Sequence, residues 1–333
     1  MPRRTTIKDV AAMAGVSKAT VSRVLAGDYP VSEETAQKVN FAVEKLRYTA
    51  SSRAKSLATG RSNAIAVVIS EPLDLFFADP TFSRILHGIS QKLTDTEIVP
   101  VLLSSVTAKE QEKTYRLISN QTVDAVIHLS PWADKGLLDR LSESEVPVVL
   151  CGQYGKLNFA NRFASVYSDD ELGGKQAAEY VFQKNVRNPV VIMGNKDQPA
   201  AVERLNGYRK VYPNLSPERI LWGDWSEETG VSGCKEILQR GMQFDCILAG
   251  SDRIARGAIA VLAQNNIMVP NQCLVIGYDD NPLARTLSPK LTTISQPMHE
   301  QGEKACEVAL DLINGAAVQI VQLPTSLIIR ETA

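Results

Sequence analysis

Arg23 is the side chain near the N-terminus best suited to read a DNA base. An arginine can donate two parallel hydrogen bonds to O6 and N7 of guanine, the commonest specific contact in the major groove. Lys18 and Ala19 would open the helix that carries Arg23, with Ser22 beside it one turn later. Hydroxyl groups near helix starts suit phosphates and fix the register on DNA. The expected DNA contacts of this region are therefore Lys18, Ala19, Ser22 and Arg23 at bases, and the hydroxyls of Thr6, Ser17 and Thr20 at phosphates.

Three short helices are predicted around Arg23. Thr6 and Asp9 form a capping-box pattern before an apolar repeat with helical spacing, and Gly15 can end that helix. Ser17 and Ser32 can cap the next two helices. The apolar stripes are Ile7, Val10, Ala11 and Ala14, then Val21, Val24 and Leu25, then Ala36, Val39, Val43 and Leu46. A helix, a four-residue turn and a helix would place the second helix in the major groove. On periodicity alone, the alternative is a generic small helical bundle with a solvated arginine.

The pattern changes from Ala64 onward, where short β-rich apolar runs alternate with longer amphipathic stretches. This rhythm predicts parallel sheets covered by helices. The remaining length of about 270 residues exceeds one ordinary core, so we expect two α/β lobes. The runs are Ala64–Ile69, Val99–Leu103, Ala125–Leu129, Val146–Cys151, Val190–Met193, Cys246–Ala249 and Leu274–Gly277.

The formal net charge of −1 hides a basic N-terminal region. Residues 1–61 contain 11 of the 36 lysines and arginines and five of the 37 aspartates and glutamates, which leaves them at +6 and the remainder at −7. A basic head on an acidic body indicates that only the head meets a polyanion. Charged faces that are merely solvated would give the same balance.

The sequence lacks the motifs that are typical of membrane proteins, secreted proteins, metalloproteins and common enzyme classes. No apolar run approaches the about 18 residues of a membrane span, and no secretory signal follows Met1, so we expect a cytoplasmic protein without a membrane partner. The five cysteines and three histidines have no metal-binding spacing, so we expect neither a metal nor a cofactor. A G-x-S-x-G motif and a phosphate-binding loop are missing, which argues against an enzyme.

The string Ile7-Lys8-Asp9-Val10-Ala11-x-x-Ala14-Gly15-Val16-Ser17-x-x-Thr20-Val21-Ser22-Arg23-Val24-Leu25 closely resembles the opening of LacI/GalR transcriptional regulators. The resemblance extends over essentially the whole chain. It implies a helix-turn-helix DNA-binding domain over residues 1–47, a hinge over 48–61, and an effector-binding and dimerisation domain over 62–333. The last would have two periplasmic-binding-protein-like lobes, about 62–166 with 297–324 and about 167–296 with 325–333.

The hinge is where the resemblance places further DNA contacts. Leu57 falls where the family has a leucine that wedges into the minor groove at the operator centre. Arg53 and Lys55 add charge for phosphates, and Ala50 stands where relatives often carry proline. A plain polar linker is the alternative, as is a segment that folds only when it docks, because isolated short helices are marginal in water.

The resemblance also implies an effector site between the lobes, and its residue types suit a sugar. Asp279 can accept from two adjacent hydroxyls, Arg204 can donate to two more, and Trp225 offers a flat apolar face for a pyranose ring. Each has an alternative: a loop turn for Asp279, an interlobe salt bridge for Arg204, and a core position for Trp225. Asp252 is a further candidate, although Ser251-Asp252 can instead cap a helix. Gln296 lies on a crossover between lobes and could bind ligand or brace the lobes.

In the first lobe, Phe77 and Asp79 follow the first strand at positions where aromatic residues of saccharide regulators line the cleft. Gln153 is the polar side chain that follows the fourth strand, and Met298 replaces an aromatic residue of some sugar binders. These departures leave the identity of the sugar open.

The function expected from the resemblance is a repressor of carbohydrate-utilisation genes that a small sugar releases from a pseudo-palindromic double-stranded operator. The chain ends just after the last expected strand, without heptads, so a homodimer is expected rather than a tetramer. The alternative is a co-repressed regulator that binds a purine-like ligand or a phosphorylated partner protein. A transport binding protein shares the two-lobed shape but would lack the basic head.

Overall fold

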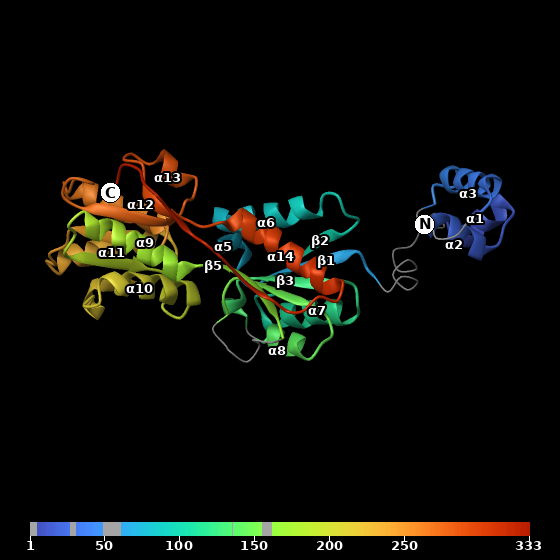
Figure 1. Cartoon of the computed structure of the whole chain (residues 1–333), viewed down its shortest axis with the longest axis horizontal. Coiled ribbons are helices and arrows are strands. Elements are labelled where there is room, and N and C mark those ends of the chain that lie inside the picture. The colour runs from blue at the N-terminus through green and yellow to red at the C-terminus, as the bar shows by residue number, and fades with distance from the viewer. Residues whose placement is uncertain (1–4, 27–30, 49–60, 135, 155–161) are drawn as a thin grey trace. The chain divides into compact units, whose positions relative to one another are not determined.

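The computed structural model describes residues 5–26, 31–48, 61–134, 136–154 and 162–333. The chain divides into two compact units, Met1–Ser62 and Asn63–Ala333. Figure 1 traces both units along the chain. The hinge residues Arg53, Lys55 and Leu57 lie outside the described residues, so their predicted roles stay predictions.

The N-terminal unit contains three helices around a small apolar core. They are α1 (Ile7–Ala14), α2 (Lys18–Ala26) and α3 (Glu33–Lys45). Gly15 ends α1 with φ of 68°, a left-handed conformation that glycine adopts without steric cost. The core contains most of the stripes expected from the sequence, with Val10, Val21 and Val39 fully buried. The expectation for Leu25 was wrong, since this side chain is 39% exposed on α2 and lies outside the core. The predicted helix-turn-helix geometry is confirmed.

The second unit contains two parallel sheets, each the centre of one lobe. The first lobe has the strand order β11-β5-β4-β3-β1-β2. Its strands are β1 (Ala64–Ile69), β2 (Val99–Ser104), β3 (Ala125–Leu129), β4 (Val148–Cys151), β5 (Ala164–Ser168) and β11 (Ile320–Leu323). Its helices are α5 (Leu73–Ala78), α6 (Pro80–Leu93), α7 (Ala108–Ser119), the 3-10 turn η1 (Pro131–Ala133), α8 (Leu137–Ser142) and α14 (Met298–Ile313).

Both faces of the first sheet are covered over its central strands β1 and β3, which explains why these two strands read as continuous apolar runs. In β1, Ile65, Val67 and Ile69 pack with residues of α6 and α14. The alternate residues Ala66 and Val68 pack with residues of α7 and α8 on the opposite face. Figure 1 shows α6 and α14 lying side by side.

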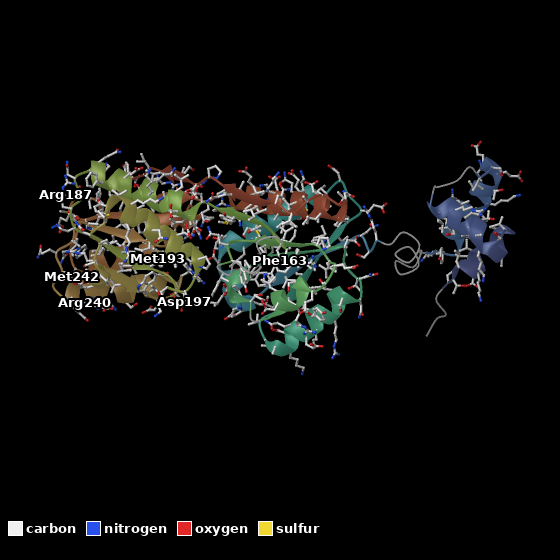
Figure 2. All side chains as sticks on the ribbon, turned by 60° about the horizontal axis from the view of Figure 1, so that its bottom comes forward. Phe163, Arg187, Met193, Asp197, Arg240 and Met242 are labelled. Atoms are coloured by element: carbon white, nitrogen blue, oxygen red, sulfur yellow. The ribbon has the colours of Figure 1, made fainter. Side chains whose placement is uncertain are left out.

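The second lobe has the strand order β12-β10-β9-β8-β6-β7, in which only β12 runs antiparallel to its neighbour. Its strands are β6 (Pro189–Met193), β7 (Ile220–Trp222), β8 (Cys246–Ala249), β9 (Leu274–Asp279), β10 (Thr292–Ser295) and β12 (Ser326–Ile328). Its helices are α9 (Asp170–Gln183), α10 (Pro199–Val211), the 3-10 turn η3 (Pro217–Arg219), α11 (Glu227–Gln239), α12 (Asp252–Gln264) and α13 (Leu283–Thr286). Figure 2 shows Met193 within this lobe and Arg187 and Arg240 at its periphery.

The chain passes between the lobes three times: from β5 to α9, from β10 to α14, and from β11 to β12. The first and third crossings are hydrogen-bonded to each other, since Asp169 N donates to Leu323 O at 2.8 Å and Thr325 Oγ1 donates to Asp169 O at 3.1 Å. All seven apolar runs named from the sequence form strands, and the predicted α/β class is confirmed. Among the described residues, no helix is both long and apolar enough to span a bilayer.

Candidate functional site

A cavity of about 320 Å³ lies between the two lobes of the second unit. Its walls are loops that follow the carboxyl ends of the strands, the usual ligand crevice of open α/β sheets. From the first lobe come residues that follow β1, β3, β4 and β5, and from the second lobe residues that follow β6 to β10. Of the predicted effector residues, six line it: Asp79, Gln153, Arg204, Trp225, Asp279 and Gln296.

Arg204 on α10 is the buried cation of this cavity. Its Nε donates to the Asp170 carboxylate at 2.8 Å and its Nη1 donates to Gly250 O at 2.5 Å. The guanidinium also lies over the rings of Tyr278 and Trp225, at 3.7 and 5.0 Å from their centroids. Burial would lower the pKa of Arg204, but the neighbouring carboxylates outweigh it and the pKa is raised. Because these partners all belong to the second lobe, the ion pair is not the interlobe bridge considered from sequence.

Asp279 ends β9 and is the second carboxylate near that cation, after Asp170. Its Oδ1 accepts from Gln296 Nε2 at 2.6 Å and lies 3.7 Å from Arg204 Nη1. Burial raises the pKa of Asp279 to about 7, and the charge of Asp79 adds to this, although Arg204 and Gln296 oppose it. Gln296 comes from the crossover between β10 and α14. It hydrogen-bonds to the Asp279 carboxylate and also lines the cavity. A hydroxyl that donates to Asp279 would favour the charged form of the carboxylate.

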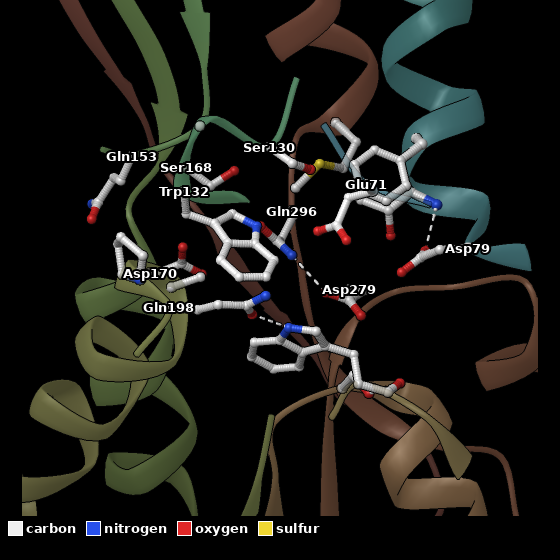
Figure 3. A pocket seen from close by; sticks show the side chains of 18 of the residues that line it. Glu71, Asp79, Ser130, Trp132, Gln153, Ser168, Asp170, Gln198, Asp279 and Gln296 are labelled. Atoms are coloured by element: carbon white, nitrogen blue, oxygen red, sulfur yellow. Dashed lines mark hydrogen bonds between the residues drawn. The ribbon is translucent and has the colours of Figure 1, made fainter. Parts of the chain in front are cut away.

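Two of the three tryptophans line the cavity, one from each lobe. Trp132 lies in η1 after β3, and Trp225 lies between β7 and α11. Each indole N–H has a partner from its own lobe: Trp132 bonds to the Glu71 carboxylate, and Trp225 donates to Gln198 Oε1. Figure 3 shows Trp132 and Gln198 turned into the same cavity. Trp225 also packs against both core clusters of its lobe. Its side chain therefore contacts the core, as the alternative from sequence proposed, and lines the cavity as well.

The first-lobe wall of the cavity is acidic. Glu71 and Asp79 both line it, and burial together with the charge of Asp79 raises the pKa of Glu71. Asp79 Oδ1 accepts from Thr81 N at 2.9 Å and so caps α6 at the cavity edge. Gln153 lies half-buried on the same side.

Two predicted effector residues do not line the cavity. Phe77 is 70% exposed, because the short helix α5 turns its neighbour Phe76 inward to stack on Phe82. Asp252 is fully buried beneath the cavity wall, where its carboxylate accepts from Thr293 Oγ1 and from Asn281 N. The sequence expectation was therefore wrong in placing these two side chains at the effector cavity. Ser251 caps α12, as considered from sequence.

Sequence reasoning missed Trp132, Glu71, Gln198 and Asp170 as candidates for the cavity wall. A usable signal existed for Trp132, since it follows the predicted strand Ala125–Leu129 by three residues and carboxyl ends of parallel strands face the ligand. No local pattern marks Gln198, which reaches the cavity only because α10 begins there.

The helix-turn-helix unit presents the predicted base-reading residues on one side. Lys18, Ala19, Ser22 and Arg23 are exposed on α2, whereas Val21 is buried on the opposite side. The expected phosphate contacts take part in helix caps. Ser17 Oγ accepts from Thr20 N at 3.1 Å, and the Asp9 carboxylate accepts from Thr6 N at 2.8 Å. Their roles on DNA stay predictions.

Comparison with known proteins adds the family. Residues 6–51 match the model of bacterial regulatory proteins of the lacI family, and residues 178–333 match the periplasmic binding protein-like domain. The chain is 33% identical to the HTH-type transcriptional regulator CelR of Thermobifida fusca over 337 aligned residues, which cover 99% of this chain and 98% of that protein. The chain belongs to the LacI family.

Solved structures agree with this LacI-family assignment. A transcriptional regulator CelR in complex with cellobiose is 31% identical, with a TM-score of 0.77 over 99% of this chain and 100% of the other. A lac repressor dimer bound to operator and the anti-inducer ONPF is 26% identical, with a TM-score of 0.85 over 99% of each chain. This LacI-family protein is therefore a DNA-binding transcriptional regulator and not an enzyme, and the resemblance stated from sequence is confirmed.

Proposed function

We propose that this regulator is a homodimeric repressor of carbohydrate-utilisation genes, and that a neutral saccharide in the interlobe cavity releases it from its operator. The observation that carries the proposal is the pair Trp132 and Trp225, which line one cavity from opposite lobes. Indole faces suit the C–H faces of sugar rings, and the carboxylates beside them accept from sugar hydroxyls. A ligand that touches both tryptophans would favour one relative position of the lobes.

The charge of the cavity supports an uncharged ligand. Among its described lining residues the acids are Glu71, Asp79, Asp170, Asp224 and Asp279, and the bases are Arg204 and Arg253. Arg204 is already paired with Asp170, so little positive charge faces a ligand. A phosphate group would meet a net negative wall, which counts against a phosphorylated ligand. An uncharged purine could stack on the same indoles, and the experiment below separates it from a sugar.

The relatives support both the sugar and the dimer. One solved relative holds cellobiose, and another is a dimer on operator DNA. In this chain the edge strand β2 exposes Val99 and Leu102, apolar side chains that a second subunit could cover. A two-fold dimer presents two reading helices to a pseudo-palindromic site. We place the protein in the cytoplasm, because such a repressor must reach chromosomal DNA.

Thermal unfolding of the full chain with a panel of ligands tests the effector class. The panel contains cellobiose, other neutral mono- and disaccharides, their phosphate esters, and purine bases. A ligand at 100 times its dissociation constant stabilises the protein by about 2.7 kcal/mol. We expect stabilisation by a neutral saccharide alone. Stabilisation by a purine or a phosphate ester, with none by the neutral sugars, would overturn the proposal.

A second measurement tests the sign of regulation. A binding site is first selected from random-sequence DNA with the ligand-free chain. Fluorescence anisotropy then follows the binding of that DNA while the stabilising saccharide is titrated. Weaker DNA binding with added sugar is the expected result, and tighter binding would identify a co-repressed regulator instead.

A further inference from the structure

Arg84 makes a contact between the lobes outside the cavity lining. It lies on α6 of the first lobe, half-buried, and its Nη1 donates to the backbone carbonyls of Asp279 at 3.3 Å and Asp280 at 3.5 Å in the second lobe. Its position along α6 places it one helical turn after Thr81, a residue of the cavity wall. The guanidinium therefore reaches the backbone of the segment whose carboxylate faces the cavity.

The segment that Arg84 reaches has an unusual backbone. Asp279 has φ of 110° and Asp280 has φ of 48°, in a region that side chains other than glycine rarely adopt. Such conformations persist only where surrounding contacts hold them, and they concentrate at ligand clamps and switch regions. Two consecutive residues of this kind stand where β9 ends at the interlobe cavity.

The second lobe holds the same segment through its side chains. The Asp280 carboxylate accepts from Arg330 at 2.5 Å and from Arg285 at 3.0 Å. The Asp279 carboxylate accepts from Gln296 at 2.6 Å. The side chains are thus fixed from the second lobe and the crossover, whereas the two carbonyls accept from the first lobe through Arg84.

The helix that carries Arg84 is itself anchored to the cavity and to its own lobe. Asp79, a cavity residue, caps its first turn, and Phe82 and Ile85 line the cavity from the same helix. One turn beyond Arg84, Gly88 packs so closely on α14 that an added Cβ would lie 2.1 Å from His299 O. α6 therefore cannot shift on α14 without disturbing this packing.

We propose that Arg84 is a positioning residue that locks the first lobe to the turn at Asp279 and Asp280. It fixes the separation of the lobes and the direction of the Asp279 carboxylate together. Movement of the first lobe would then carry Arg84 away from the two carbonyls, and a ligand that orders Asp279 would favour the position in which Arg84 is bound. This last step rests on the proposed function, whereas the interlobe contact does not.

The contact is tested without any ligand. Nitroxide labels are placed on the full chain at Lys113→Cys on α7 and Lys235→Cys on α11, one in each lobe, since the native cysteines are all buried. Labelled chain is diluted into excess unlabelled chain, and pulsed electron resonance gives the interlobe distances.

We expect Arg84→Met to broaden the distribution of interlobe distances and lengthen its mean, and Arg84→Lys to restore it in part. Lys92→Met is the matched control, because Lys92 lies on the same helix and pairs with Glu307 within the first lobe. A distribution in Arg84→Met that equals those of wild type and control would overturn the proposal.

A second experiment, with ligand, distinguishes failure of this inference from failure of the proposed function. Isothermal titration of the unlabelled full chain with cellobiose compares wild type, Arg84→Met and Lys92→Met. We expect roughly tenfold weaker binding for Arg84→Met and no change for the control, as for loss of one hydrogen-bonded charge. If cellobiose does not bind the wild type, the neutral saccharide that stabilises it in the thermal panel replaces cellobiose. If no neutral saccharide stabilises it, the proposed function fails and the distance result alone decides on Arg84. A cellobiose affinity that is equal in wild type and Arg84→Met would overturn the link between Arg84 and the ligand.

Discussion

The Asp279 carboxylate lies 3.7 Å from the Arg204 guanidinium, which is already bonded to Asp170 at 2.8 Å. Both acids line the cavity, and Asp279 is the less tightly paired of the two with Arg204, although it also accepts from Gln296. A buried carboxylate with an incomplete set of partners is ready to accept from a hydroxyl, because it gains hydrogen bonds that desolvation removed. The predictions for the effector site depend on this asymmetry.

Asp279→Asn should uncouple sugar from DNA. The variant keeps the shape of the side chain but replaces one acceptor oxygen by a donor group, so paired sugar hydroxyls lose a charged acceptor. We expect saccharide binding to weaken by about 3 kcal/mol, or more than 100-fold, with operator affinity unchanged in the absence of sugar. Anisotropy of labelled operator across a sugar titration measures both quantities. If the variant left DNA at wild-type sugar concentrations, Asp279 would not be the sensing residue.

Saccharide affinity should rise as the pH rises from 6 to 8. Burial raises the pKa of Asp279 from 3.8 to about 7, so much of the free protein carries a protonated carboxyl at pH 6. A sugar hydroxyl that donates to the charged form must displace that proton, which weakens binding by up to about tenfold for each pH unit below the pKa. Calorimetric titrations at several pH values, in buffers of different ionisation enthalpy, measure the protons released. An affinity that falls over this range would contradict the assignment.

The stability of the ligand-free protein should change in the opposite sense. The folded state holds the Asp279 proton up to about pH 7, whereas the unfolded chain releases it near pH 4. Stability from this group is therefore present at low pH and is lost as the pH rises from about 4 to 7. Urea unfolding of wild type and Asp279→Asn over that range isolates the contribution, since the asparagine cannot titrate. Parallel curves for the two proteins would show that Asp279 titrates normally.

Loss of either cavity tryptophan should weaken saccharide binding without affecting DNA. Trp132→Ala and Trp225→Ala each remove an aromatic face, and we expect a loss of about 1–3 kcal/mol apiece. Trp222→Ala is the matched control, because Trp222 lies on β7, is 39% exposed and does not line the cavity. Titration calorimetry of the three variants separates them. Equal losses in all three would indicate general destabilisation rather than stacking.

More of the fold than of the effector site could be predicted from the sequence. Runs such as Ala64–Ile69 are buried on both faces and so are apolar throughout, which makes central strands visible in the sequence. The sequence did not predict strands β5 and β10, because Tyr167 and Ser168 or Thr292 and Thr293 interrupt the apolar pattern. The hydroxyls of Ser168 and Thr293 have buried hydrogen-bond partners, Gln301 and Asp252, that are distant in the sequence. The strand β7 has three residues, too few to show a period.

Among the residues at the site, those in sequence motifs were predicted and those without a local pattern were misplaced or missed. Asp279, Arg204 and Trp225 lie in motifs that the family shares, and they meet in the structure. Phe77 was misplaced because a helix as short as α5 gives no period that distinguishes Phe76 from Phe77. Arg84 has no sequence signal at all, since its partners are backbone carbonyls almost 200 positions away. Contacts to backbone leave no pattern of residue types.

Arg23→Ala should lower operator binding by about 1–3 kcal/mol and relax the preference at one symmetric pair of positions. Arg23 is exposed on α2 with Lys18 and Ser22, where it can reach base edges. Lys55→Ala should instead weaken all sequences alike and reduce the salt slope by about one unit. Selection from a random DNA library, followed by affinities at several salt concentrations, distinguishes the two. Equal losses by Arg23→Ala on specific and non-specific DNA would remove its base-reading role.

Arg204→Met should destabilise the protein as well as weaken saccharide binding. Arg204 is 5% exposed and is the partner of buried Asp170, so its loss leaves a buried carboxylate without its cation, at a cost of about 3–5 kcal/mol. Adding Asp170→Asn should recover part of that loss, because the unpaired charge is gone. Arg209→Met is the control, since Arg209 is exposed on the same helix. Urea unfolding of the four proteins, followed by tryptophan fluorescence, gives the free energies. If the double variant were no more stable than Arg204→Met, the cost would lie in the lost contacts to Tyr278 and Gly250 rather than in the charge of Asp170.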